Sequence, residues 1–213
     1  MSSKRGLLMG AGAVGAAFAL LLSGCSDVGT QSADHDHITH QHEATPDGGA
    51  HTGGAHTDAD IAFARDMVPH HEQAIVMSDI ILAKRGIDPR VTELANQIKA
   101  AQGPEIATMQ QWLTEWGAPA ASGHDGHDMG DPSAHAAMGM MTEEQLEQLR
   151  LAEGVEAARL FLTGMIAHHE GAVTMAQTEV DSGKAQDAVH LAHEIIDTQQ
   201  REIVVMKQIL GSL

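Results

Sequence analysis

Cysteine is nearly absent from this chain, which has one residue of that type, Cys25, among 213. A single cysteine cannot form an intrachain disulfide, so any soft-metal chemistry must use ligands other than thiolate. Aromatic residues are also scarce, at 2% of the sequence, and tyrosine is missing. Because β-sandwiches and barrels draw on aromatic side chains, this composition favours a helical bundle packed with Ala, Leu, Ile and Met.

Positive charge is in short supply as well. The chain has 12 Lys and Arg residues against 29 Asp and Glu residues, which gives a formal net charge of -17 at pH 7. Such a chain repels nucleic acids and anionic membrane surfaces and attracts cations. We therefore expect no nucleic-acid partner, and metal ions become the expected ligands.

The N-terminus has the layout of a secretory signal. Lys4 and Arg5 precede an apolar stretch that ends at Leu22 and is too short and too rich in glycine for a comfortable membrane span. The letters "LSGC" that end at Cys25 resemble a bacterial lipobox. We expect residues 1–24 to be removed and Cys25 to be lipidated, which would hold the protein outside the cytoplasm on the cell membrane. A plain secretory signal and a single-pass anchor stay open as alternatives.

Two segments, residues 25–57 and 117–141, are polar and rich in glycine and histidine, without a periodicity that could bury a face. We predict that the first is a disordered tether and the second a linker. Their histidines lie beside acidic residues, so the segments either capture Cu(II), Zn(II) or Ni(II) loosely or act only as solvated spacers.

An internal repeat organises the rest of the chain. The letters "DMVPHHEQAIVM" at residues 66–77 are echoed by "GMIAHHEGAVTM" at residues 164–175. Further along, "LANQIKAAQGPEIATM" at residues 94–109 is echoed by "LAHEIIDTQQREIVVM" at residues 191–206. A duplicated helical hairpin is the simplest explanation, and two such hairpins pack most simply as an all-α four-helix bundle with an internal pseudo-two-fold axis.

The two hairpins are expected at residues 58–116 and 142–213. Thr142 has the features of a helix N-cap, with Gln145 completing a capping box, and Gly154 should interrupt the helix that follows. The expected helices span roughly residues 58–85, 90–116, 142–181 with that interruption, and 185–210.

A soft-metal site is predicted on the buried stripes. At the helical period, Met67, His70, His71 and Met77 fall within about 120° of arc. Thioether and imidazole both bind Cu(I) readily, whereas thioether has little affinity for Mg, Ca or Zn. A single Met on such a stripe is more often packing, but the joint pattern, placed twice, favours copper. The candidate ligands are Met67, His70, His71, Met77, Met109, Met165, His168, His169, Met175 and Met206.

The second helix of each hairpin carries polar residues on its buried stripe: Gln102 and Glu105 in one, Gln199 and Glu202 in the other. An unpaired buried carboxylate is costly. We expect both glutamates to accept hydrogen bonds from imidazoles on the neighbouring helix, as outer-shell carboxylates do at metal sites, or to be ligands themselves. Pro69, which has no counterpart in the second hairpin, should kink the first helix.

Three motifs carry a resemblance to a known family: "MxxHHxxA" in both hairpins, "GMMTEEQL" at residues 139–146 and "LxxEIIxxQQxEIxxM" at residues 191–206. They resemble the bacterial family called domain of unknown function 305, over roughly residues 58–213. The resemblance implies a ferritin-like four-helix bundle. It also implies extracytoplasmic copper binding linked to copper resistance, because some relatives are of that kind, and it points to the ten candidate ligands above.

These observations predict an extracytoplasmic lipoprotein that binds copper, as Cu(I) in the bundle, for sequestration, transfer or tolerance. It would exchange metal with a partner protein and would have no catalytic residues. One alternative is a ferritin-like metal-dependent oxidase, although the chain has no Glu-x-x-His motif of the di-iron type. Another is a structural or interaction lipoprotein without metal. Whether the hairpins form one shared site or two, and the oligomeric state, stay open.

Overall fold

The computed structural model describes residues 55–118 and 136–213. The predicted signal, the lipidation site Cys25, nearly all of the tether and most of the linker lie outside these residues. The described part is helical and contains no strand, which confirms the predicted all-α bundle. None of its helices is both long and apolar enough to cross a membrane. The helices are α1 (Asp58–Leu82), α2 (Pro89–Glu115), α4 (Glu143–Leu151), α5 (Gly154–Ser182) and α6 (Gln186–Leu210).

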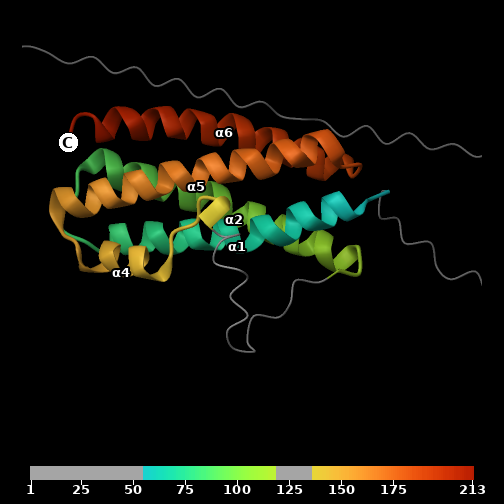
Figure 1. Cartoon of the computed structure of the whole chain (residues 1–213), viewed down its shortest axis with the longest axis horizontal. Coiled ribbons are helices and arrows are strands. Elements are labelled where there is room, and N and C mark those ends of the chain that lie inside the picture. Colours follow the sequence, from blue (N-terminus) through green and yellow to red (C-terminus); the bar gives the residue numbers. More distant parts are fainter. Residues whose placement is uncertain (1–54, 119–135) are drawn as a thin grey trace, which may run out of the picture. The chain divides into compact units, whose positions relative to one another are not determined.

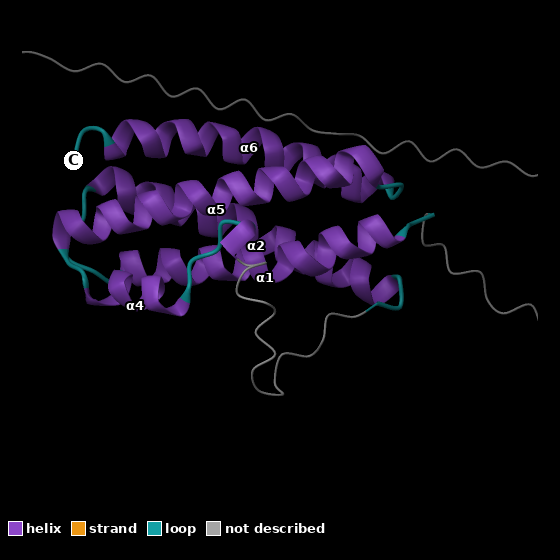
Figure 2. Ribbon diagram, viewed as in Figure 1, coloured by secondary structure: helices purple, strands orange, loops and turns teal. Residues whose placement is uncertain are grey.

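The four long helices form two hairpins, α1 with α2 and α5 with α6 (Figure 1). The hairpins meet chiefly through α1 and α5, so these two helices are the central pair of the bundle. The short helix α4 packs against both of them, alongside the end of α1 that leads into α2 (Figure 2). The helices that carry the two histidine pairs therefore lie against each other.

Local sequence signals account for several helix ends. Thr142 and Gln145 form the predicted capping box, with the Gln145 backbone N–H donating to the Thr142 hydroxyl at 3.2 Å and the Gln145 side chain accepting from the Thr142 N–H at 2.8 Å. The predicted interruption is also present, because α4 ends at Leu151 and α5 begins at Gly154, whose φ is +53°. Pro69 stays inside α1, which begins eleven residues earlier at Asp58.

The apolar core consists of two separate clusters with polar residues between them along every long helix. On α1, the cluster around Phe63 and Met67 precedes the histidine pair, and the cluster around Met77 follows it. On α5 the order of the clusters is reversed, because the helices run in opposite directions. The helices α2 and α6 likewise place Gln102 and Gln199 between members of the two clusters. The bundle thus has a polar layer across its middle.

The segment Met138–Met141, called the strap here, lies against α5 at very short range. A Cβ atom on Gly171 would be 1.7 Å from the Met138 carbonyl oxygen, and one on Gly139 would be 2.0 Å from the Ala167 carbonyl oxygen. Gly139 also has a φ of +74°, which favours glycine. Glycine at both positions is therefore a condition for the strap to lie on α5.

A buried carboxyl pair joins the start of α1 to the turn between α5 and α6. Asp60 is fully buried and accepts hydrogen bonds from the backbone N–H groups of Thr57, Lys184 and Ala185 at 2.6, 2.9 and 2.8 Å. Burial alone would raise the pKa of Asp60, but these bonds and the Thr57 hydroxyl lower it to about 2. Burial and the neighbouring Asp60 raise the pKa of Glu179 to about 8, so Glu179 is protonated near neutral pH.

The close approach of the strap to α5 can be tested with two glycine substitutions. Gly171→Ala places a methyl group against the backbone of Met138 and should lower the free energy of unfolding by about 1–3 kcal/mol. Gly211→Ala, at the end of α6, would make only ordinary contacts of 3.4 and 3.8 Å and should change it by less than about 0.5 kcal/mol. Urea unfolding at pH 7 measures both values, and a neutral Gly171→Ala would contradict the described position of the strap.

The carboxyl pair predicts a specific pH dependence. The folded pKa of Glu179, about 8, lies above its ordinary value of 4.5. The folded protein therefore keeps a proton that the unfolded chain releases, and stability falls as pH rises between these values, by up to about 1.4 kcal/mol per pH unit. Glu179→Gln removes this titration, so its stability relative to the wild type should increase between pH 5 and pH 9. Urea unfolding checks this, with the exposed Glu144→Gln as the control, which should track the wild type.

Candidate metal centre

The four histidines of the repeat meet in one place. His70 and His71 come from α1, His168 and His169 come from α5, and all four are fully buried. The ring centroids of His70 and His168 are 3.6 Å apart and their planes are inclined by 33°, so the two rings form a tilted stack. The two hairpins therefore contribute to one shared histidine centre instead of two separate ones.

Each hairpin anchors one imidazole with a carboxylate. Nε2 of His71 lies 2.8 Å from Oε2 of Glu105, and Nε2 of His169 lies 2.8 Å from Oε2 of Glu202. These are the hydrogen bonds expected from the sequence, whereas the part that the glutamates play beside a metal stays a prediction. Because a carboxylate accepts, Nε2 carries a proton in both rings, and Nδ1 is the ring nitrogen left without a partner.

The other two imidazoles differ from each other. Nε2 of His70 donates to the Met138 carbonyl oxygen of the strap at 2.9 Å, because a carbonyl can only accept. His168, its counterpart in the repeat, has no hydrogen-bond partner at either nitrogen. The pseudo-symmetry of the hairpins therefore ends at the strap, which accepts a hydrogen bond from only one of the two stacked rings.

Unpartnered nitrogen atoms are the main chemical feature of this centre. Nδ1 is buried without a hydrogen bond in all four histidines. Buried polar atoms in proteins are nearly always paired, so four unpaired ring nitrogens in one layer need an explanation. A metal ion that accepts electron density from imidazole nitrogen provides one, because neutral imidazole is the common ligand form of histidine.

The protonation state of the stacked pair suits such a role. Burial, helped by the nearby His71 and His169, lowers the pKa of His70 to about 3. Burial also lowers the pKa of His168 well below its usual value, and the three other imidazoles add to this effect. Both rings are therefore neutral at neutral pH, so a metal ion would not have to displace a proton from them.

The candidate methionines flank the histidine layer on both sides. Met67 and Met109 belong to one apolar cluster, and the half-buried Met175 packs against it. Met77, Met165 and Met206 belong to the other cluster and are fully buried. Each cluster thus receives methionines from both hairpins, because the two methionines of each "MxxHHxxxxxM" segment lie on opposite sides of the layer.

Sequence reasoning missed the strap as part of the site. Met138 contributes its backbone carbonyl, which no side-chain pattern reveals. A signal was present, because the repeat places Gly171 where the first hairpin has Gln73, and a glycine inside a helix often marks a close backbone approach. Gln102 and Gln199, which lie in the layer and are 2% and 3% exposed, keep unpaired amide atoms and complete its polar surface.

The four imidazoles do not by themselves form a ready metal cage. Within residues 55–118 and 136–213, no group of three or more His, Cys, Asp or Glu side chains is arranged to hold a metal ion. The layer instead combines buried imidazole nitrogens with thioether-bearing clusters on either side. The fold and this layer define a class of protein: an all-α bundle of two repeated hairpins around a central histidine layer.

Sequence comparison identifies the family within that class. The sequence profile of the domain of unknown function DUF305 matches residues 60–210, so the chain belongs to the DUF305 family. A DUF305 fragment from Deinococcus radiodurans is 30% identical and superposes with a TM-score of 0.66, over 74% of this chain and 98% of that one. A DUF305 protein from Streptomyces coelicolor is 31% identical with a TM-score of 0.63, over 72% of this chain and 91% of that one.

A third similar protein, CopM, has been solved with metal. Its Cu(II)-bound form is 30% identical to this chain with a TM-score of 0.60, and its Cu(I)-bound form is 29% identical with a TM-score of 0.57. Both comparisons cover 72% of this chain and 96% of CopM. CopM has also been solved with silver and without metal. A search of curated proteins found no match.

The buried neutral histidines predict destabilisation by acid. The pKa values of His70 and His168 are lowered in the folded state, so the unfolded chain binds protons below about pH 6.5 that the folded protein does not. Their contribution to stability is therefore complete at pH 7 and decreases as pH falls. His168→Phe keeps an aromatic ring but cannot titrate, so its stability relative to the wild type should increase between pH 7 and pH 4.5.

Glu179 titrates in an overlapping pH range and has the opposite effect on stability. Because both proteins contain Glu179, its contribution cancels when the free energies of unfolding of His168→Phe and the wild type are subtracted. The exposed His190→Gln is the matched control and should track the wild type. Urea unfolding at pH 7, 5.5 and 4.5 measures the effect. Parallel pH profiles for His168→Phe and the wild type would show that His168 is not held neutral.

Proposed function

We propose that this protein binds copper outside the cytoplasm, holding Cu(I) in the bundle through imidazole and thioether groups for sequestration, transfer or tolerance. The observation that carries the proposal is the histidine layer, in which four buried Nδ1 atoms have no hydrogen-bond partner. The similarity to CopM, which has been solved with Cu(I), Cu(II) and silver, supports the choice of metal.

The donor set fits Cu(I) better than a hard or strongly charged ion. Neutral imidazole and thioether ligands suit a soft monovalent cation, whereas Mg, Ca and Mn prefer oxygen ligands. Glu105 and Glu202 are engaged in hydrogen bonds with His71 and His169, so they are not free oxygen ligands for a hard divalent ion. A Cu(I) ion adds one positive charge to this layer and needs the least compensation.

Specific residues can be given roles in such a centre. The stacked pair, His70 and His168, would provide nitrogen ligands from opposite hairpins. Met67 and Met165 lie three residues before them on the same helices and would supply sulfur. Glu105 and Glu202 would fix the tautomer and ring orientation of His71 and His169, as outer-shell carboxylates do. Met77, Met109 and Met206 would offer further sulfur atoms in the clusters on either side of the layer, and Met175, which is half-buried, is the most peripheral member of the set.

An extracytoplasmic, lipid-anchored location completes the proposal. It rests on the signal-like N-terminus and the "LSGC" letters that end at Cys25. The Streptomyces coelicolor relative is likewise described as a candidate secreted protein. The acidic surface, with a net charge of -17, would concentrate cations near the bundle and favour metal exchange with a partner protein.

A metal-dependent oxidase is the second candidate, because Glu105 and Glu202 add two carboxylates to the histidine layer. Their hydrogen bonds to imidazole favour an orienting role over an iron-binding one. Metal analysis of protein purified without a His tag separates the candidates. Copper in near-integral ratio supports the proposal, iron supports the oxidase, and the absence of both favours a structural or interaction role.

Removing the histidine layer tests the copper proposal directly. Replacing His70, His71, His168 and His169 by alanine should abolish tight Cu(I) binding, measured by competition with a colorimetric Cu(I) chelator. The matched control replaces the exposed His190 and His193 by alanine and should bind as the wild type does. His168→Phe alone, which removes a ring without a hydrogen bond, should lower the affinity on the order of tenfold or more. Circular dichroism verifies folding, and unchanged tight binding in the folded variants would refute the assignment.

A further inference from the structure

The strap is tied to α1 at both of its ends. His70 donates to the carbonyl oxygen of Met138 at 2.9 Å. At the other end, the amide of Gln73 donates from Nε2 to the Met141 carbonyl oxygen at 2.9 Å and accepts from the Met141 N–H at 2.7 Å. Because these bonds involve only the backbone of Met141, its side chain is held in position without being used for anchoring.

The side chain of Met141 meets that of Met77 above Gly164. A Cβ atom on Gly164 would lie 2.8 Å from Sδ of Met141 and 3.3 Å from Cε of Met77. Met77 is fully buried and Met141 is 9% exposed. The missing side chain at Gly164 therefore leaves room in which two thioethers, one from α1 and one from the strap, come together.

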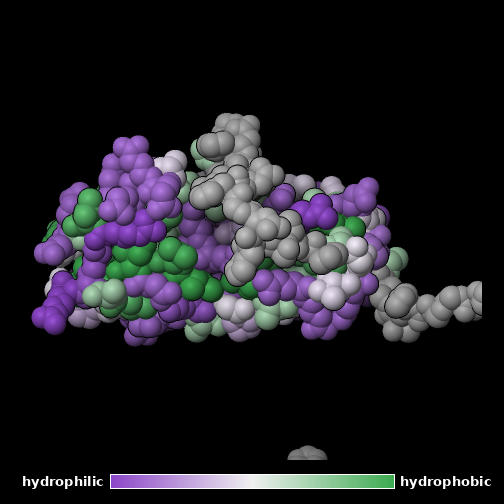
Figure 3. Space-filling model, turned by 90° about the horizontal axis from the view of Figure 1, so that it is seen from below, coloured by the Kyte–Doolittle hydropathy of each residue, from purple (hydrophilic) through white to green (hydrophobic). Residues whose placement is uncertain are grey.

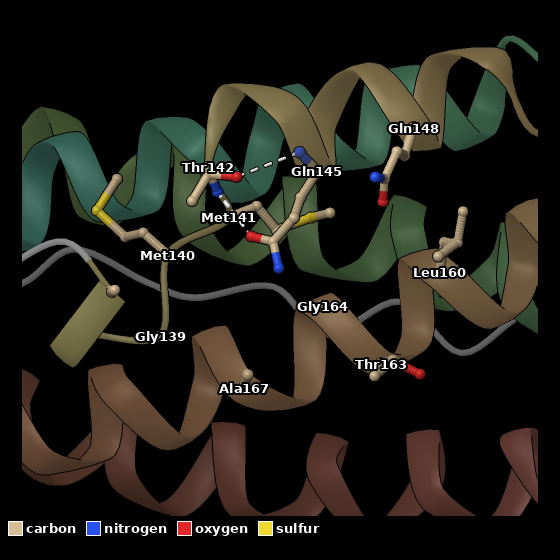
Figure 4. A pocket seen from close by; sticks show the side chains of 11 residues that line it. Gly139, Met140, Met141, Thr142, Gln145, Gln148, Leu160, Thr163, Gly164 and Ala167 are labelled. Atoms are coloured by element: carbon tan, nitrogen blue, oxygen red, sulfur yellow. Dashed lines mark hydrogen bonds between the residues drawn. The ribbon is translucent and has the colours of Figure 1, made fainter. Parts of the chain in front are cut away.

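A pocket of about 360 Å³ adjoins this pair. It is lined by the strap residues Gly139, Met140 and Met141 and by Gly164 and Ala167 of α5 (Figure 4). The side chains of Met140 and Met141 extend to opposite sides of the strap (Figure 4). Met141, and not Met140, is among the nearest neighbours of a Cβ atom on Gly164. Figure 3 shows the face of the molecule on which α4 lies. Hydrophobic residues gather on that face, and hydrophilic residues surround them.

Among the residues that the structure describes, the opposite end of the bundle has no such pair of fully buried thioethers. In the repeat, Asp66 takes the place of Gly164, and the counterpart of Met77 is the half-buried Met175. Asp66 and Met175 line another pocket, of about 250 Å³, together with Glu179. The carboxyl groups of Asp66 and Glu179 lie beside the thioether in that pocket, so its donor atoms are less selective for soft cations than those of the strap pocket.

We propose that Met77 and Met141 form a soft-cation site at the strap pocket, separate from the histidine layer, through which Cu(I) reaches that layer. Two converging thioethers are uncharged, polarisable ligands that suit Cu(I) or Ag(I). Gly164 lies one helical turn before His168, so an ion held by the pair is next to the histidine layer. The inference rests on the proposed function for the identity of the physiological ion.

Silver(I) is a redox-inert probe for this site. The full chain, labelled with 13C at the methionine ε-methyl groups, is titrated with Ag(I) and followed by NMR, which separates the bundle from the His-rich segments residue by residue. The ε-methyl resonances of Met77 and Met141 should shift together, and that of Met140 should not. In Met141→Leu, the Met77 response should require on the order of tenfold more Ag(I), whereas Met140→Leu should behave as the wild type.

Gly164→Ala provides a second test that leaves both sulfur atoms in the protein. Its methyl group would meet the flexible end of Met141, so the helix should fold while the two thioethers are pushed apart. The coupled shifts of Met77 and Met141 should then disappear. A Met77 titration that is identical in the wild type, Met141→Leu and Gly164→Ala would overturn the inference.

The His168→Phe variant distinguishes this inference from the proposed function. If Ag(I) still shifts Met77 and Met141 in that variant, the thioether pair binds independently of the histidine layer, as inferred. If the pair responds only when His168 is present, the thioethers are not a separate site and the inference fails, whereas copper binding by the histidine layer would be unaffected. Slower Cu(I) loading in Met141→Leu, with unchanged final affinity, would support the role of the pair in access.

Discussion

The packing of α1 against α5 is the contact on which the rest of the structure depends. It stacks His70 on His168 and buries all four imidazoles of the repeat. A buried polar layer costs free energy unless its atoms find partners. Two of its imidazoles are paired with Glu105 and Glu202 from the outer helices. The unpaired Nδ1 atoms that remain are the reason to expect a metal ion in this layer.

The pseudo-symmetry of the hairpins is broken by a single short segment. The strap lies on α5 only because Gly139 and Gly171 allow the backbones to approach closely. It then accepts a hydrogen bond from His70, while His168 has none. Both hairpins contribute to the histidine layer, whereas residues present in only one of them, such as Gly164 and Gly171, make its two ends chemically different.

Much of the fold was predictable because the signals are local or repeated. The capping box at Thr142, the break at Gly154 and the hairpin repeat all act over a few residues or one helical period. The expected hydrogen bonds from imidazole to Glu105 and Glu202 followed from the cost of burying a carboxylate. The kink expected at Pro69 is a local effect, and α1 continues through that residue. The carbonyl of Met138 and the pairing of Met77 with Met141 depend on contacts between distant segments, which no periodicity encodes.

The sequence by itself determined the helical class, the repeat, the acidic character and the candidate ligands, because composition and spacing along one helix are enough to define them. Only the tertiary structure decided that the two histidine pairs form one centre, which ring is left without a hydrogen bond, and which methionines meet. Those outcomes depend on how α1, α5 and the strap pack together. This packing depends on how well segments that are far apart in the sequence fit together in shape. At Gly164 and Gly171 the fit requires that no side chain be present.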